Sequence, residues 1–159
     1  EISLEEAHKG AMRLVGLPGG RRLEVKLPAG VDSGSKIHFA PDGGSEGEFY
    51  LVVSVKEHPR FRRQGRDLYT EVETSLEDAI LGNDLTVTTL TGLLALTIPP
   101  ETQNGRRFRL AGQGMPVLNV PDVKGDLYAT IKVTLPTDLT PEEQELFLRF
   151  KELRAGKET

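Results

Sequence analysis

The 159-residue chain contains no cysteine and no tryptophan, and only 6% of its residues are aromatic. Without cysteine, a disulfide framework, a thiolate zinc site and a cysteine nucleophile are all excluded. The three histidines, His8, His38 and His58, lack the close spacing of histidine metal sites. We therefore expect no metal and no cofactor. The scarcity of aromatic residues also argues against a carbohydrate-binding β-sandwich, since such modules usually display exposed rings.

Charge and hydropathy exclude two further classes of partner. The formal net charge is −4 and the isoelectric point is about 5.5, whereas binding to a phosphate backbone usually requires a positive surplus. No apolar run approaches the roughly 20 residues that cross a bilayer. We therefore expect neither nucleic acid as the main partner nor a membrane, and the composition is typical of a globular protein.

Carboxylates are the main candidate catalytic groups in this sequence. An enzyme would have to use carboxylate pairs, such as Glu71 with Glu73 or Asp122 with Asp126, as an acid and a base. With 24 acidic residues in the chain, close pairs arise by chance. The nucleophile motif GxSxG and the phosphate-binding Walker loop are both absent from the sequence. We therefore expect that the protein is not an enzyme.

A repeat organises the chain. Residues 3–10 (SLEEAHKG) recur as residues 75–82 (SLEDAILG), and residues 47–50 (GEFY) recur as residues 125–128 (GDLY). Two copies of a pattern indicate two copies of a structural unit. In the first pair the serine suits a helix N-cap and the glycine suits a helix end, which predicts two short capped helices. The second copy also carries a loop insertion, rich in glycine, proline and asparagine, after Ala111.

Apolar and polar residues alternate in several segments, including residues 23–27 and 127–135. A period of two residues predicts β-strands with one buried face. The predicted fold is mainly β, with two tandem small β-barrel or sandwich-like domains, short helices and a C-terminal α-helix. We place the first domain at residues 1–65, the second at residues 66–137 and the helix within residues 138–159.

The C-terminal segment has strong helix signals. Thr140 and Pro141 match an N-cap and a first-turn proline. Apolar residues then follow at Phe147, Leu148 and Phe150, which suggests a two-fold dimer contact in which the same patch meets itself. The alternative, that the helix docks on the second domain of its own chain, stays open.

The order of these motifs resembles the C-terminal region of the DnaJ-type J-domain co-chaperones. The resemblance covers essentially the whole chain and is strongest in residues 55–69 (VKEHPRFRRQGRDLY) and 103–116 (QNGRRFRLAGQGMP). It implies two tandem β-domains that bind unfolded or partly folded polypeptides for delivery to a DnaK-type chaperone, followed by a dimerising helix. It also implies a cytoplasmic protein.

Some parts of the family pattern are missing from this sequence. The J-domain is not represented, so we do not expect this stretch to stimulate ATP hydrolysis through such a domain. The Cys-x-x-Cys motifs of the zinc-bearing subclass are also absent, and only the short turn at residues 18–20 (PGG) stands where that module is inserted. The chain therefore resembles the zinc-free subclass.

The resemblance also implies where a client would bind. An extended client segment adds to a sheet edge of the first domain, while its apolar side chains enter a shallow groove. By position, the groove strands are residues 12–17 and 49–53. This predicts Val15, Leu17 and Leu51 as client-binding residues, with Met12 and Leu14 as runners-up. A one-residue slip exchanges the two sets, because adjacent strand residues face opposite sides.

Two alternatives stay open for these residues and for the chain. Each predicted groove residue could equally be a core residue, and the chain as a whole could be a structural dimerisation module.

A basic cluster lies at the junction of the domains and consists of Arg60, Arg62, Arg63 and Arg66. It either attracts the acidic tail of a DnaK-type chaperone or forms a solvated face. Next to it, Phe61 and Tyr69 are predicted to pack the two domains together, and the alternative is that they contact clients.

Overall fold

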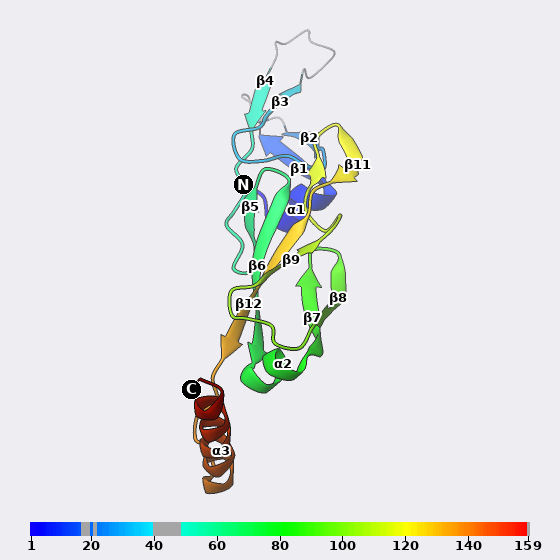
Figure 1. Ribbon diagram of the computed structural model, residues 1–159. Helices are drawn as coiled ribbons and strands as arrows, with labels where there is room; N and C mark the ends of the chain where they lie inside the picture. The colour runs from blue at the N-terminus through cyan, green and yellow to red at the C-terminus, as the bar shows by residue number, and fades with distance from the viewer. Residues whose placement is uncertain (17–19, 21, 40–48, 159) are drawn as a thin grey trace.

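The computed structural model of the protein describes residues 1–16, 20, 22–39 and 49–158. Figure 1 shows an elongated molecule, with β3 and β4 at one end and α3 at the other. The elements follow one another as α1 (Leu4–Lys9), β1 (Ala11–Gly16), β2 (Arg22–Leu27), β3 (Lys36–Phe39), β4 (Phe49–Val52), β5 (Arg62–Gln64), β6 (Asp67–Ser75), α2 (Leu76–Leu81), β7 (Asn83–Thr89), β8 (Gly92–Ile98), β9 (Arg107–Leu110), β10 (Pro116–Val117), β11 (Val120–Lys124), β12 (Leu127–Thr134) and α3 (Pro141–Glu158). The prediction of a mainly β protein with short helices and a C-terminal helix is confirmed.

Both copies of the serine-led segment form capped helices, as the sequence predicts. The hydroxyl of Ser3 accepts a hydrogen bond from the Glu6 N–H at 3.1 Å, and the hydroxyl of Ser75 accepts one from the Asp78 N–H at 3.2 Å. In α1, the Glu6 carboxylate accepts the N–H of Ser3 in return, which completes a capping box. Each helix ends at a glycine with a positive φ, 85° and 84° respectively. The two helices therefore start and stop by the same local chemistry.

Each of these helices leads into an antiparallel hairpin, α1 into β1–β2 and α2 into β7–β8. The second strand of each hairpin carries an equivalent buried pair, Val25 and Leu27 in β2 and Leu96 and Ile98 in β8. A proline follows both pairs in the sequence. The sequence repeat is therefore a structural repeat of a helix and a hairpin.

The largest sheet has four strands in the order β5-β6-β12-β9. Strand β12 runs parallel to β6 and antiparallel to β9, while β5 is antiparallel to β6 (Figure 1). Leu127, Ala129 and Ile131 of β12 lie on its buried face. The residues between them, including Tyr128, belong to the opposite face, because successive strand residues alternate sides.

Residues from both halves of the chain join one hydrophobic core. The first half contributes Ile2, Leu4, Ala7, Val25, Leu27, Val31, Val53 and Phe61, and the second half includes Leu68, Met115, Leu127 and Ile131. The predicted boundary near Gly65 lies inside the β5–β6 hairpin. The pairing of β5 with β6 therefore links the two halves, in addition to the covalent chain. The division into two domains stays a sequence prediction.

The insertion of the second copy anchors this junction. Met115 is fully buried. Its N–H donates to the carbonyl of Arg66 at 2.7 Å, and its own carbonyl accepts the N–H of Gly125 at 2.9 Å. A Cβ atom on Gly114 or Gly125 would collide with the carbonyl oxygen of Arg66, so both positions need glycine for this close approach.

The C-terminal helix α3 projects beyond the β-strands (Figure 1). Its N-terminus has the predicted cap, because the Glu143 N–H donates to the Thr140 hydroxyl at 3.1 Å and the Thr140 N–H donates to the Glu143 carboxylate at 2.9 Å. Every residue from 141 to 157 is exposed. Docking of the helix on its own second domain, one of the two alternatives, is therefore not seen in the described part of the chain.

Candidate functional site

Met12 and Leu14 form an exposed apolar pair on the outer face of β1. Their exposed fractions are 52% and 68%. The register pairs Met12 with Lys26 and Leu14 with Glu24 of β2, and these two partners are exposed as well. Because residues two apart on a strand share a face, the two apolar side chains lie next to each other in solvent, bordered by charged residues.

The other face of the same hairpin turns toward the core. Ala11 pairs with Leu27 and Arg13 pairs with Val25, and both of these β2 residues are buried. Arg13 forms an ion pair with Glu6 of α1. The even-numbered residues of β1 therefore form its outer face. Met12 and Leu14, which the sequence prediction ranked second, lie on that face.

The leading residues of the sequence prediction are placed differently. Val15 belongs to β1, but the structure does not describe its side chain, and Leu17 lies outside the described residues. Leu51 pairs with Ile37 across β3 and β4, and both side chains pack against the core. Its neighbour Val52 is 60% exposed and was missed by sequence reasoning. The alternation of faces along β4 is the signal that could have identified it.

Two hairpins of the first half have open edges in the part of the chain that the structure describes. Within the described residues, β1 and β2 form a two-stranded sheet, and so do β3 and β4. A strand with a neighbour on one side presents unpaired N–H and C=O groups on the other side. Such an edge can accept an extended peptide as a further strand, and the exposed apolar pair on β1 lies beside one.

Helix α1 fixes the start of β1 through its acidic residues. Hydrogen bonding to the Ser3 backbone, and then the ion pair with Arg13, lower the pKa of Glu6. A hydrogen bond with its own backbone lowers the pKa of Glu5, and so does His58, whose Nε2 lies 2.6 Å from Glu5 Oε1. Both carboxylates therefore stay ionised at neutral pH and hold β1 and the turn at residues 58–61 against the helix.

The basic cluster at the junction divides into two kinds of residue. Arg60, Arg62 and Arg66 are exposed. Arg63 instead inserts among backbone carbonyls, and burial lowers its pKa while Asp32 opposes that shift. The cluster is thus partly structural, and the predicted packing role of Phe61 agrees with its burial.

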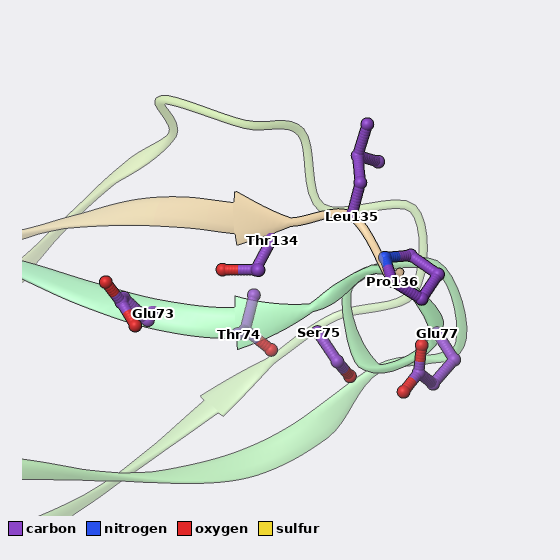
Figure 2. Close-up of a pocket in the computed structure, with 7 residues that line it drawn as sticks. All are labelled: Glu73, Thr74, Ser75, Glu77, Thr134, Leu135 and Pro136. Atoms are coloured by element: carbon purple, nitrogen blue, oxygen red, sulfur yellow. The ribbon is translucent and has the colours of Figure 1, made fainter. Parts of the chain in front are cut away.

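A separate hollow of about 330 Å³ lies where the chain leaves β12 toward α3. Figure 2 shows Thr74, Ser75 and Glu77 around the end of β6, with Leu135 turned away from them. Five of the seven residues that line it are polar, and Leu135 and Pro136 are the two apolar ones. It lies away from the strands that carry the predicted client-binding residues, and it gives no support to an apolar client site there.

The described residues contain no group of three or more His, Asp or Glu side chains able to hold a metal ion. Likewise, none of the helices described is long and apolar enough to cross a membrane.

Comparison with known proteins places these features in a family. The family described as the DnaJ C terminal domain matches residues 1–136. Chaperone protein DnaJ of Chelativorans sp. is 42% identical over 144 residues, which cover 86% of this chain and 38% of that protein. Chaperone protein DnaJ 2 of Thermus thermophilus is 40% identical over 154 residues, which cover 95% of this chain and 54% of that protein.

A third relative, Chaperone protein DnaJ 2 of Synechocystis sp., is 36% identical over 151 residues, which cover 95% of this chain and 48% of that protein. The chain thus spans about half or less of the length of these relatives. The match agrees with the expectation that the protein is not an enzyme, since this is a family of chaperones. Over nearly its whole length, the chain belongs to the DnaJ C-terminal domain family.

Proposed function

We propose that this chain binds extended apolar segments of unfolded polypeptides along β1, for delivery to a DnaK-type chaperone in the cytoplasm. The observation that carries the proposal is the exposed pair Met12 and Leu14 on a strand that has a partner strand on one side only among the described residues. Membership of the family supports the same role.

The mechanism requires no catalytic group. A client segment pairs its backbone with the open edge of β1, and these hydrogen bonds do not depend on the client sequence. Covering an exposed Leu14 or Met12 with a client side chain removes apolar area from water, which is worth about 1.5–3 kcal/mol for each fully buried side chain. The surface therefore selects hydrophobic segments and tolerates many sequences.

The other predicted residues keep a place in the proposal. Val15 and Leu17 continue the same segment of chain, and Leu51 of β4 packs against the core. Val52 adds an exposed apolar side chain on β4. Met12 and Leu14 replace Val15, Leu17 and Leu51 as the leading contacts.

A peptide array and an aggregation assay test this site. We expect Leu14→Asp and Met12→Asp to weaken binding of apolar peptides by about tenfold and to reduce suppression of the aggregation of a denatured protein. Leu93→Asp is the matched control, because Leu93 is an exposed leucine of the second half, at 74%. Binding by the folded Leu14 and Met12 variants equal to that of the wild type would refute the site.

We further propose that the chain dimerises through α3. Phe147, Leu148 and Phe150 are all exposed there, together with Leu146 and Leu153. On a helical wheel, Leu146, Phe150 and Leu153 share one face, while Leu148 lies on the other. A second copy of the helix would cover the stripe of Leu146, Phe150 and Leu153 by a two-fold contact, and Leu148, on the opposite face, would stay outside that contact.

The remaining alternatives are distinguished by the same assays. A purely structural dimerisation module would form dimers but would not suppress aggregation or bind apolar peptides. A carbohydrate-binding module has no support from the family match. We also assign the chain to the zinc-free subclass, because the sequence carries no cysteine to hold the metal.

A further inference from the structure

Asn104 and Gly105 lie in the exposed turn that leads into β9. The Arg106 N–H donates to the carbonyl of Gln103 at 3.2 Å, and Gly105 has a φ of 88°. A hydrogen bond that closes four residues, with a positive φ at the third of them, is typical of a type II turn and favours glycine at that position. An asparagine therefore directly precedes the glycine of a tight turn.

Two hydrogen bonds attach this turn to β12. The Gly105 N–H donates to the carbonyl of Ile131 at 2.7 Å. The side chain of Asn104 supplies the other bond, because its Oδ1 accepts the N–H of Val133 at 2.9 Å. The strand pairing of β9 with β12 stops before these residues. The turn therefore continues the edge of the four-stranded sheet beyond its last strand pair, and the asparagine side chain takes the place of a backbone acceptor.

An asparagine that precedes a glycine is chemically labile. The backbone nitrogen of the glycine attacks the side-chain carbonyl carbon of the asparagine and forms a new C–N bond. The side-chain nitrogen leaves as ammonia and takes the proton of the backbone nitrogen with it. Glycine favours this ring closure because it has no Cβ to obstruct it. Water then opens the resulting succinimide at one of its two carbonyls, which gives aspartate or isoaspartate.

In the folded protein, both reacting groups are held by β12. The attacking nitrogen would be that of Gly105, whose hydrogen is bonded to the carbonyl of Ile131. The carbon under attack belongs to the Asn104 amide, whose oxygen is bonded to the N–H of Val133. Ring closure requires the two groups to rotate into contact, and both hydrogen bonds resist that rotation. The reaction therefore requires the turn to open first.

We propose that Asn104 is a latent site of spontaneous deamidation, which reacts when the turn at residues 103–106 leaves β12. Local opening of an exposed segment requires less free energy than global unfolding. Isoaspartate lengthens the backbone between residues 104 and 105 by a carbon atom, so the two bonds to β12 can no longer form together. The modification therefore turns a reversible opening into a permanent loss of this sheet edge. It concerns the second half of the chain and does not depend on the client site on β1.

The test compares deamidation of the whole chain in buffer and in guanidinium chloride, at one pH and temperature, by tryptic digestion and mass spectrometry. In denaturant we expect Asn104 to react fastest of the three asparagines, because Asn83 precedes an aspartate and Asn119 a valine. In buffer the rate at Asn104 should be at least about tenfold lower. Fragment spectra distinguish Asn104 from Asn83, which lies on the same tryptic peptide (67–106). An isoaspartyl methyltransferase detects the isoaspartate.

Asn104→Gln is the matched control for the effect on the fold, because glutamine cyclises far more slowly while every other residue ages alike. Both proteins are aged in denaturant, refolded and then unfolded by heat. The aged wild type should unfold at a lower temperature than fresh wild type, whereas aged and fresh Asn104→Gln should coincide. The proposal is overturned if Asn104 reacts as fast in buffer as in denaturant. It is also overturned if aged wild type with isoaspartate at residue 104 unfolds at the temperature of the fresh protein.

Discussion

The guanidinium of Arg63 donates a hydrogen bond to the carbonyl oxygen of Val31 at 2.6 Å. The same side chain also donates to the carbonyls of Gly30, at 3.0 Å, and Gly65, at 2.7 Å. Arg63 belongs to β5 of the central sheet, whereas residues 30 and 31 follow the β1–β2 hairpin. One half-buried arginine therefore ties the hairpin that carries the proposed client site to the sheet of the second half.

Replacing this arginine should loosen that connection. We expect Arg63→Met to lower the free energy of unfolding by about 2–3 kcal/mol, because the carbonyls of Val31 and Gly30 lose a charged donor. Urea unfolding measures the change. The control is Arg62→Met on the same strand, whose side chain is exposed and should cost less than about 0.5 kcal/mol. Equal effects of the two substitutions would show that the tether contributes nothing.

Gly125 should not tolerate alanine. A Cβ atom there would meet the carbonyl group of Arg66, although the backbone conformation of Gly125 is open to any residue. We expect Gly125→Ala to destabilise the fold by about 1–3 kcal/mol through overpacking, as a fall in the thermal unfolding midpoint. Gly16→Ala is the control, because nothing lies within 4 Å of its added Cβ. A midpoint unchanged in both variants would contradict the packing argument.

His8 should make stability depend on pH. It is buried on α1, its Nδ1 has no hydrogen-bond partner among the described residues, and burial followed by the charge of Lys124 lowers its pKa from 6.5. The folded state therefore keeps His8 neutral at a pH where the unfolded chain binds a proton. The contribution of His8 to the free energy of unfolding is therefore constant above pH 6.5, and it falls as the pH drops below that value.

Urea unfolding of the wild type and of His8→Gln from about pH 5 to pH 7.5 measures this effect. The substitution should flatten the decline on the acid side of the curve, even if it lowers stability at every pH. The two proteins differ only at residue 8, so the comparison isolates the effect of His8. Parallel curves for the two proteins would mean that His8 is not responsible.

The charges of α3 suggest how two copies would pair. Acidic residues gather near its N-terminus, at Glu142 and Glu145, and basic residues near its C-terminus, at Arg154 and Lys157. An antiparallel pair of helices brings the acidic end of one copy to the basic end of the other. We therefore expect a protein with Glu142→Lys and Glu145→Lys to be monomeric, and likewise one with Arg154→Glu and Lys157→Glu.

Mixing these two variants should restore dimers, because each then meets a helix of opposite charge. Light scattering measures the mass before and after mixing. Circular dichroism controls for loss of helix in the single proteins, and that loss would persist in the mixture. If the mixture stays monomeric while the wild type dimerises, the antiparallel arrangement is wrong; a monomeric wild type would refute the dimer itself.

The sequence predicted those features that depend on neighbouring residues. In the caps at Ser3, Ser75 and Thr140, each side chain accepts a hydrogen bond from an amide three residues away. Such motifs can be recognised in the sequence without knowledge of the fold. The alternation of β12 likewise identified Leu127, Ala129 and Ile131 as the buried face. Such patterns need only the geometry of a single element.

The choice of face on β1 was beyond the sequence. Its apolar residues occupy both parities, so alternation alone does not say which set is buried. The decision lies in the register, which sets Arg13 opposite the buried Val25. An arginine on the inner face is unexpected, and it is accepted there because Glu6 of α1 pairs with it. Because this ion pair joins a strand to a helix, the residue pattern of β1 alone does not reveal it.

The stacking of Tyr69 on Tyr128 could not be predicted for the same reason. Tyr69 and Tyr128 become neighbours only because β6 and β12 run in parallel, and nothing in either segment specifies its partner. Sequence reasoning placed Tyr69 at a packing junction, and its stacking on Tyr128 accounts for part of that role.

The parallel pairing of β6 with β12 also has a consequence for biosynthesis. The amide of Asp126 donates to the carboxylate of Asp67 at 2.9 Å, across 59 residues of chain. Leu68 emerges from the ribosome long before its partner strand β12, and contacts so distant along the chain form slowly. Until β12 has been translated, the nascent chain lacks the strand that pairs with β6, and apolar side chains such as Leu68, which is buried in the folded protein, are exposed to solvent.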